Sequence, residues 1–200
     1  MLVKDIIKRV LSLTDLREEM TFINSLSDTP ENLDISVINT VTQFVNASAF
    51  ENVNELLNIT NFVISEIANS YIPMVKEDVI SVPSTAVAIA DLSEKIVKII
   101  DVQKDGESIK YKTQVNVIKS SRKIDKIIYQ FMPKIYRINQ KVEGFTSTLF
   151  DSDIAIGVLA EYYLKIGRFD EASLLRKRFL YVLERAKKLK SVVMGERAWL

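Results

Sequence analysis

The chain of 200 residues carries 27 basic and 26 acidic side chains, for a formal net charge of +1, and contains neither cysteine nor histidine. A charge this close to zero gives no overall attraction to DNA, membranes or acidic partners. Without cysteine and histidine, disulfides, thiolate chemistry and the commonest general base are excluded. A hydrophobic content of 48% is that of an ordinary globular protein, and the length fits one domain, residues 1–200.

Residues 1–72 have the apolar periodicity of helices. In the first segment, apolar residues at positions 2, 6, 10 and 13 share one helical face, and charges of both signs interrupt the run. This predicts a helix docked on the protein, because a signal peptide needs an uninterrupted apolar core and the polar face is mixed in sign. No segment reaches the roughly 20 apolar residues of a membrane span, so we expect no membrane partner. Further helices are predicted over residues 15–26, 34–45 and 53–71, with breaks at Pro30 and Pro73.

Residues 75–132 change in character and become rich in Val, Ile, Thr and Tyr. This composition is typical of strands, and Asp105-Gly106 is a strong signal for a two-residue hairpin turn. We therefore predict an antiparallel meander of about four strands inserted between helices, which places the protein in the α+β class. The predicted strands are residues 78–82 and 86–90, divided by Pro83, then 95–104, 109–117 and 127–131, with a turn at 120–123.

Residues 133–150 have no clear period and are predicted to be a linker, and residues 151–190 to form a helical hairpin. Asp151 and Asp153 supply negative charge at the start of the first helix, and Gly167 ends it. Glu161 and Lys165, four residues apart, are expected to pair. The second helix has an apolar stripe. Its members are Phe169, Ala172, Leu175, Phe179, Val182, Ala186 and Leu189.

The last segment, residues 191–200, has no periodicity, and we predict an extended tail with the single tryptophan, Trp199, near its end. Exposed tryptophan is often the anchor of an interface. Two interpretations stay open, namely docking of Trp199 into a partner and packing of Trp199 on its own domain.

Residues that could carry catalysis are sparse. The chain has five glycines and no glycine-rich phosphate loop, and Asp151 with Asp153 are better explained as residues that start a helix than as metal ligands. We predict that the protein is not an enzyme and takes no metal or cofactor. Pairs of carboxylates for acid–base work remain an alternative, namely Glu18 with Glu19 and Glu66 with Glu77.

The run from Lys119 to Lys123, together with Lys126, is basic. Such a run is able to contact the phosphates of nucleic acid, but the net charge of the whole chain favours a solvated turn.

Four short segments resemble one family when they are taken with the order of the predicted elements. They are YQFMP at residues 129–133, FDSD at 150–153, GRFDEA at 167–172 and RAWL at 197–200. Over residues 34–200, this combination of helices, meander, linker and helical hairpin resembles the head-to-tail adaptor, or connector, proteins of tailed bacteriophages. The first 33 residues have no counterpart in that pattern.

The resemblance implies a structural protein of the virion neck, made in the host cytoplasm. Such proteins form a ring with copies of themselves, commonly twelve, beneath the portal vertex of the capsid, and join it to the tail or neck proteins. The C-terminal tail would dock on the portal, the Asp105-Gly106 hairpin is a candidate for contact with the ring or the tail, and DNA would only pass through the lumen. The implied docking residues are Met194, Arg197, Ala198, Trp199 and Leu200.

An alternative comes from residues 162–172, which are similar to the helix–turn–helix core of a tetratricopeptide repeat. Repeats of this kind need about three copies to bury their faces, and the sequence contains one. A protein-binding scaffold built on a helical hairpin is therefore the second hypothesis.

Overall fold

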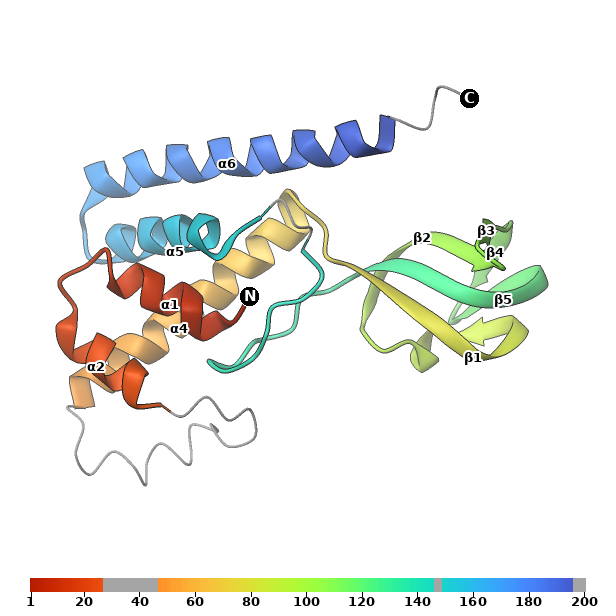
Figure 1. Ribbon diagram of the computed structural model, residues 1–200, viewed down its shortest axis with the longest axis horizontal. Coiled ribbons are helices and arrows are strands. Elements are labelled where there is room, and N and C mark those ends of the chain that lie inside the picture. Colours follow the sequence, from red (N-terminus) through yellow and green to blue (C-terminus); the bar gives the residue numbers. More distant parts are fainter. Residues whose placement is uncertain (27–46, 146–148, 196–200) are drawn as a thin grey trace. The chain divides into compact units, whose positions relative to one another are not determined.

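The computed structural model describes residues 1–26, 47–145 and 149–195 (Figure 1). These residues form helices and an antiparallel sheet, which confirms the α+β class. The chain divides into two compact units, a helical unit of Met1–Ile72 with Lys134–Leu200 and a sheet unit of Pro73–Pro133. The predicted helix over residues 34–45 lies outside the described residues. The helices are α1 (Val3–Leu11), α2 (Arg17–Ser25), α4 (Ala47–Ser70), α5 (Asp151–Lys165) and α6 (Phe169–Gly195), and the strands β1 (Val75–Ala88), β2 (Ile96–Lys104), β3 (Glu107–Ser108), β4 (Tyr111–Gln114) and β5 (Val117–Phe131), with a 3₁₀ turn η2 (Ile89–Asp91).

Helix α1 is docked in the helical unit, as its periodicity predicts. Its apolar face is buried, and helices α2, α4 and α5 pack around it. The segment predicted as an irregular linker is held against it by the main chain, since the N–H of Lys4 donates to the carbonyl of Ile138 (2.8 Å) and the N–H of Val142 to that of Met1 (2.8 Å). The Asn61 side chain of α4 fixes the same segment by bonding both the N–H (2.7 Å) and the carbonyl (2.9 Å) of Tyr136.

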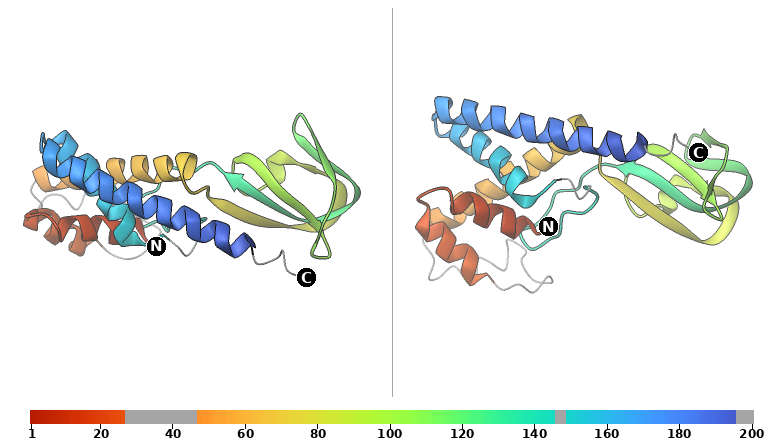
Figure 2. Two further views of the ribbon diagram at one scale, coloured as in Figure 1. Left: turned by 90° about the horizontal axis from the view of Figure 1, so that it is seen from above. Right: turned by 45° about the horizontal axis from the view of Figure 1, so that its top comes forward.

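Helices α5 and α6 form the predicted hairpin around one very close contact. Gly167 has a φ of +80°, as expected for a glycine after a helix. A Cβ atom added to Gly157 of α5 would lie 2.7 Å from the ring of Phe179 of α6, which is fully buried. Only glycine therefore permits this approach of the ring to the α5 backbone. Figure 2 shows α6 running back along α5 and on past its start.

Charged side chains also join the helices, but not as the sequence predicted. The expected pair of Glu161 with Lys165 is wrong, because each has a closer partner on another helix. Arg176 of α6 bonds Glu161 (3.0 Å) and also Glu66 of α4, whereas Lys165 pairs with Glu55 of α4. Arg176 thus links three helices from a half-buried position, where ion pairs are less screened than at the surface.

Helix α6 is longer than the helix predicted and reaches Gly195. The first five residues of the predicted extended tail, 191–195, are therefore helical. The physical reason is that no glycine or proline occurs between Gly167 and Gly195, so nothing in the chain stops the helix earlier. The apolar stripe is partly as predicted: Ala172, Phe179 and Ala186 are buried, but Phe169 is exposed and Leu183 takes a buried place.

The sheet unit is built on β5, its last strand. The strand order is β1-β5-β2-β3, and β4 also pairs with β5. All ladders are antiparallel. The side chains of β5 that alternate into the core explain this central place. The buried set on β5 is Ile118, Ile124, Ile127, Tyr129 and Phe131.

Three strand predictions are wrong. Residues 109–117 form no single strand, because a turn at Val115 (φ 47°) and Asn116 separates β4 from β5. Residues 120–123 are no turn but belong to β5. The alternation of apolar and polar residues runs on through a turn that lacks glycine, so it does not mark the reversal. The division of two strands at Pro83 is wrong as well, because β1 runs from Val75 to Ala88 without a break and residues 89 and 90 belong to η2. Pro83 instead lies where the register of β1 with β5 shifts, and proline is tolerated at such an irregularity.

The contact between Gly157 and Phe179 leads to a first prediction. Gly157→Ala forces the ring of Phe179 to move, which costs about 1–3 kcal/mol for overpacking and outweighs the roughly 0.5–1 kcal/mol that alanine gains in a helix. We expect a lower free energy of unfolding in urea. In a Phe179→Leu background the ring is gone, and the same substitution is expected to be neutral or stabilising. A stabilising effect of Gly157→Ala in the native background would contradict the close contact.

Candidate interaction surfaces

The predicted docking tail follows directly on α6. Met194 lies in the last turn of this helix, and Arg197, Ala198, Trp199 and Leu200 lie outside the described residues. The contact of Gly157 with Phe179 aligns the two helices. Counted from it, α5 begins about two turns away, whereas α6 continues for about four. The C-terminal end of α6 therefore extends beyond the start of α5 (Figure 1).

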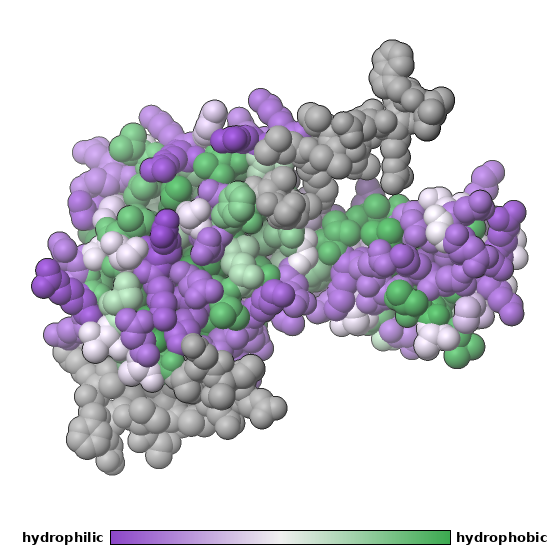
Figure 3. All heavy atoms as spheres, in the orientation of Figure 1, coloured by the Kyte–Doolittle hydropathy of each residue, from purple (hydrophilic) through white to green (hydrophobic). Residues whose placement is uncertain are grey.

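The outer face of α6 is a surface that the sequence-based predictions did not include. Leu174 and Tyr181 are 72% and 68% exposed, and Arg178 and Arg185, also exposed, lie on the same helical face at spacings of three and four. Tyrosine and arginine are enriched among the residues that dominate binding energy at interfaces. Figure 3 shows hydrophobic and hydrophilic residues intermixed over the visible face of the helical unit. The signal for this surface is present in the sequence, on the side of the helix opposite the buried stripe.

The Asp105-Gly106 hairpin is confirmed. Both residues have positive φ, 52° and 81°, as a type I′ turn requires, and Gln103 pairs with Ser108 across it. The N–H of Asp105 donates to the Asp125 carboxylate of β5 (2.9 Å), which holds the tip against the central strand. The exposed tip offers hydrogen-bonding groups and no large apolar anchor, which suits the rim of an interface more than its centre.

A titratable cluster in the sheet unit joins Asp78, Ser93 and Tyr129. The Asp78 carboxylate accepts hydrogen bonds from the Tyr129 hydroxyl (2.7 Å), the Ser93 N–H (2.8 Å) and the Ser93 hydroxyl (2.7 Å). Burial acts to raise the pKa of Asp78, but these hydrogen bonds and the charge of Lys76 together lower it below its usual 3.8. Burial raises the pKa of Tyr129, and the bond to Asp78 adds to this.

The cluster is a clamp for the loop after η2. Perturbed pKa values point to a functional site when a group is left to react with a substrate. Here the groups satisfy one another, and the Tyr129 oxygen also accepts from the N–H of Glu94 (3.2 Å). The arrangement fixes the loop that leads into β2 and offers no free nucleophile or base.

The other carboxylates singled out by the sequence have separate partners. Glu66 pairs with Arg176 in the helical unit, and Glu77 pairs with Lys126 (2.6 Å) in the sheet unit. Glu19 accepts a bond from Asn52 (2.7 Å). At the start of α5, the Asp153 carboxylate accepts from the N–H of Phe150 (3.0 Å), which confirms its role in beginning the helix.

The chain matches no protein-family model, and no curated protein matches it. Among the described residues, no helix is both long and apolar enough to span a membrane.

The clamp gives a second prediction. Because the folded state lowers the pKa of Asp78, its stabilising effect is present above the unfolded pKa and is lost as the pH falls through the folded pKa. We expect the urea concentration at the unfolding midpoint of the sheet unit, measured through the NMR signal of the Ser93 amide, to fall on acidification from about pH 5 to pH 2.5. In the Asp78→Asn variant this midpoint is expected to fall less. Asp91→Asn, an exposed carboxylate of the same loop, is the matched control and is expected to keep the native pH dependence.

Proposed function

We propose that this protein is a structural component of a tailed-phage virion, a ring-forming head-to-tail adaptor that docks on the portal and joins capsid to tail. One observation carries the proposal most: α6 continues about four turns past the contact of Phe179 with Gly157, and residues 196–200 come directly after it in the sequence. The element order and the RAWL ending, which resemble the adaptor family, support the same role.

The proposed contacts follow from the two units. The segment from Met194 through Trp199 and Leu200 would dock on the portal, with tryptophan as the apolar anchor. The Asp105-Gly106 hairpin would contact a neighbouring copy or the tail through hydrogen bonds at a rim. A closed ring needs a head-to-tail interface that repeats around one axis, and the outer face of α6 is a second exposed surface of suitable composition. The location would be the neck of the virion.

A tetratricopeptide-like scaffold is the alternative. The α5–α6 hairpin has the glycine turn that such a unit needs, but its helices differ in length, 15 and 27 residues. Stacked repeats bury continuous faces between similar units. The hairpin instead packs on α4 and α1, which favours the adaptor proposal.

Removal of the tail tests the proposal. We expect a chain lacking residues 194–200 to have the same unfolding temperature as the full chain. Native mass spectrometry of this shortened chain with the portal protein of the same phage is expected to detect no complex of the two proteins. Trp199→Ala is expected to weaken docking strongly, and Trp199→Phe, which keeps an aromatic anchor, much less.

The purified native chain, alone and with the portal protein, supplies the decisive comparison. A closed ring alone, or a monomer that joins the portal only with Trp199 present, supports the adaptor. A monomer indifferent to the portal overturns it. A loss of several degrees in thermal stability on truncation would place Trp199 in the chain's own core.

A further inference from the structure

The charge of the sheet unit is distributed unevenly. Residues 109–124, which form β4, the turn and the first half of β5, contain five basic residues and no acidic one. The segment of β1 that pairs with this part of β5, within residues 79–90, contains no charged residue at all. The strands at this end of the sheet, which we term the basic lobe, therefore contain no acidic residue. The exposed Asp91 ends the adjoining η2, whose first residue, Ile89, donates its N–H to the carbonyl of Asn116 (2.8 Å). The cations of the basic lobe are Lys110, Lys112, Lys119, Arg122 and Lys123, and all are exposed.

Two of these cations face each other across a ladder. In the β4–β5 pairing, Lys112 lies directly opposite Lys119. Like charges in this position destabilise a sheet, so the arrangement weakens the fold where it stands alone. A negatively charged partner bound between the two lysines would replace this repulsion by attraction of both lysines to the partner.

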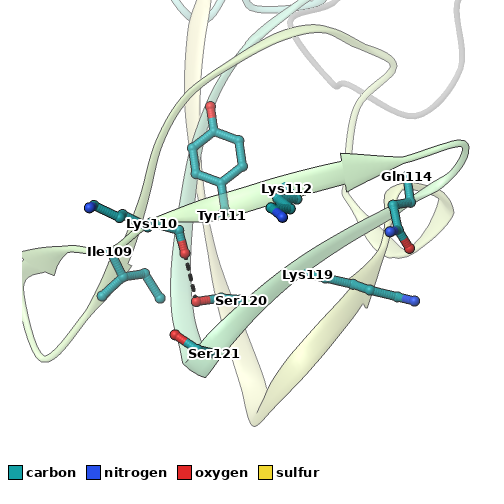
Figure 4. Close-up of a pocket in the computed structure, with 8 residues that line it drawn as sticks. All are labelled: Ile109, Lys110, Tyr111, Lys112, Gln114, Lys119, Ser120 and Ser121. Carbon is teal, nitrogen blue, oxygen red and sulfur yellow. Dashed lines mark hydrogen bonds between the residues drawn. The ribbon is translucent and has the colours of Figure 1, made fainter.

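The basic lobe also forms a shallow hollow of about 640 Å³. Figure 4 shows Lys110, Lys112 and Lys119 spread along the hairpin around it, with Ser120 and Ser121 on β5. The Ser120 hydroxyl donates to the Lys110 carbonyl (2.9 Å) and so fixes one side of the hollow. The positive groups are thus held at intervals on a rigid hairpin and do not converge on one point.

The lysines of the sheet unit outside the basic lobe show a contrast. Lys126 pairs with Glu77 (2.6 Å), and Lys76 pairs with Glu94 (3.6 Å). Among the residues that the structure describes, none of the five cations of the basic lobe forms an ion pair. Two of the five lysines of the sheet unit outside the basic lobe are thus neutralised, whereas, within the described part of the chain, none of the five cations of the basic lobe is.

We propose that the basic lobe binds the phosphate backbone of double-stranded DNA without sequence preference. A row of exposed cations with hydroxyl and amide neighbours matches the groups that contact phosphates. Single-strand binding relies on exposed aromatic platforms, whereas Tyr111, the one aromatic residue of the lobe, is half-buried. A protein partner would require an apolar centre, whereas the exposed residues of β4 and of the first half of β5 are polar or charged apart from Val115 at the turn. The exposed large apolar residues at this end of the sheet, Val79 and Val82, lie on β1, which carries none of the cations of the basic lobe.

The net charge of the chain gave a different expectation for this segment. The basic run at residues 119–123 is no solvated turn but part of β5, and β4 adds Lys112 to it, with Lys110 directly before that strand. The whole chain is nearly neutral because its basic and acidic residues are almost equal in number, but residues 109–124 contain none of the acidic ones. DNA binding by the purified chain does not require a ring or a portal, so its failure would leave the adaptor proposal untouched.

The test measures binding of the full chain to a fluorescein-labelled DNA duplex of mixed sequence by anisotropy at several salt concentrations. The native chain is expected to bind with an affinity that falls steeply with salt. The variant K110Q/K112Q/K119Q is expected to bind at least tenfold more weakly. Its slope of log affinity against log salt is expected to be smaller by up to about 2.7, at about 0.9 for each phosphate that the variant no longer neutralises.

A matched control removes the same charge elsewhere. K98Q/K177Q/K187Q replaces three exposed lysines outside the basic lobe and is expected to retain native affinity. The test variant should fold, because it relieves the repulsion between Lys112 and Lys119, and a thermal midpoint no lower than native checks this. Absence of duplex binding in low salt overturns the proposal, as does equal loss in both variants. Binding to polyglutamate in preference to DNA overturns it in favour of an acidic protein partner.

Discussion

The approach of Phe179 to the backbone at Gly157 is the contact on which the helical unit depends. The ring lies where any other residue would place a Cβ atom, so it fixes both the distance and the alignment of α5 and α6. Helix α5 in turn packs on α1 and α4, and Arg176 ties α6 to α4 through Glu66. The position of the C-terminal end of α6 follows from this alignment. A constraint inside the core thereby sets where α6 ends.

The sheet unit depends on a different constraint, which is the central place of β5. Strands β1, β2 and β4 all pair with it, although β5 is the last strand in the chain. Its register with β1 shifts around Ser84, and beyond that shift lies the basic lobe. The half nearer to Phe131 carries the buried Tyr129 and the Asp78 clamp. Strand β5 therefore carries the Asp78 clamp at one end and the exposed cations at the other, with buried side chains in both halves.

Local signals in the sequence were sufficient where local forces decide the structure. The turn at Asp105-Gly106 and the end of α5 at Gly167 were predicted because positive φ favours these residues whatever surrounds them. The prediction that Glu161 pairs with Lys165 was wrong because the packing of three helices brings Arg176, which is distant in sequence, to Glu161. The prediction of one strand over residues 109–117 was wrong for a similar reason. Valine does not favour a turn, and the turn at Val115 is imposed by the pairing of β4 with β5.

The same distinction explains why the net charge gives no account of the basic lobe. Net charge sums over the whole chain, whereas a partner meets only the charges that the fold brings to one surface. Lys112 and Lys119 lie opposite each other only because of the register between β4 and β5. Neither the composition nor the net charge of the chain reveals this pair. A protein that keeps an unfavourable pair at an exposed position gives up some stability there. Binding of an anion at that position would recover it, and this gain in stability is the basis of the proposal that the basic lobe is a binding surface.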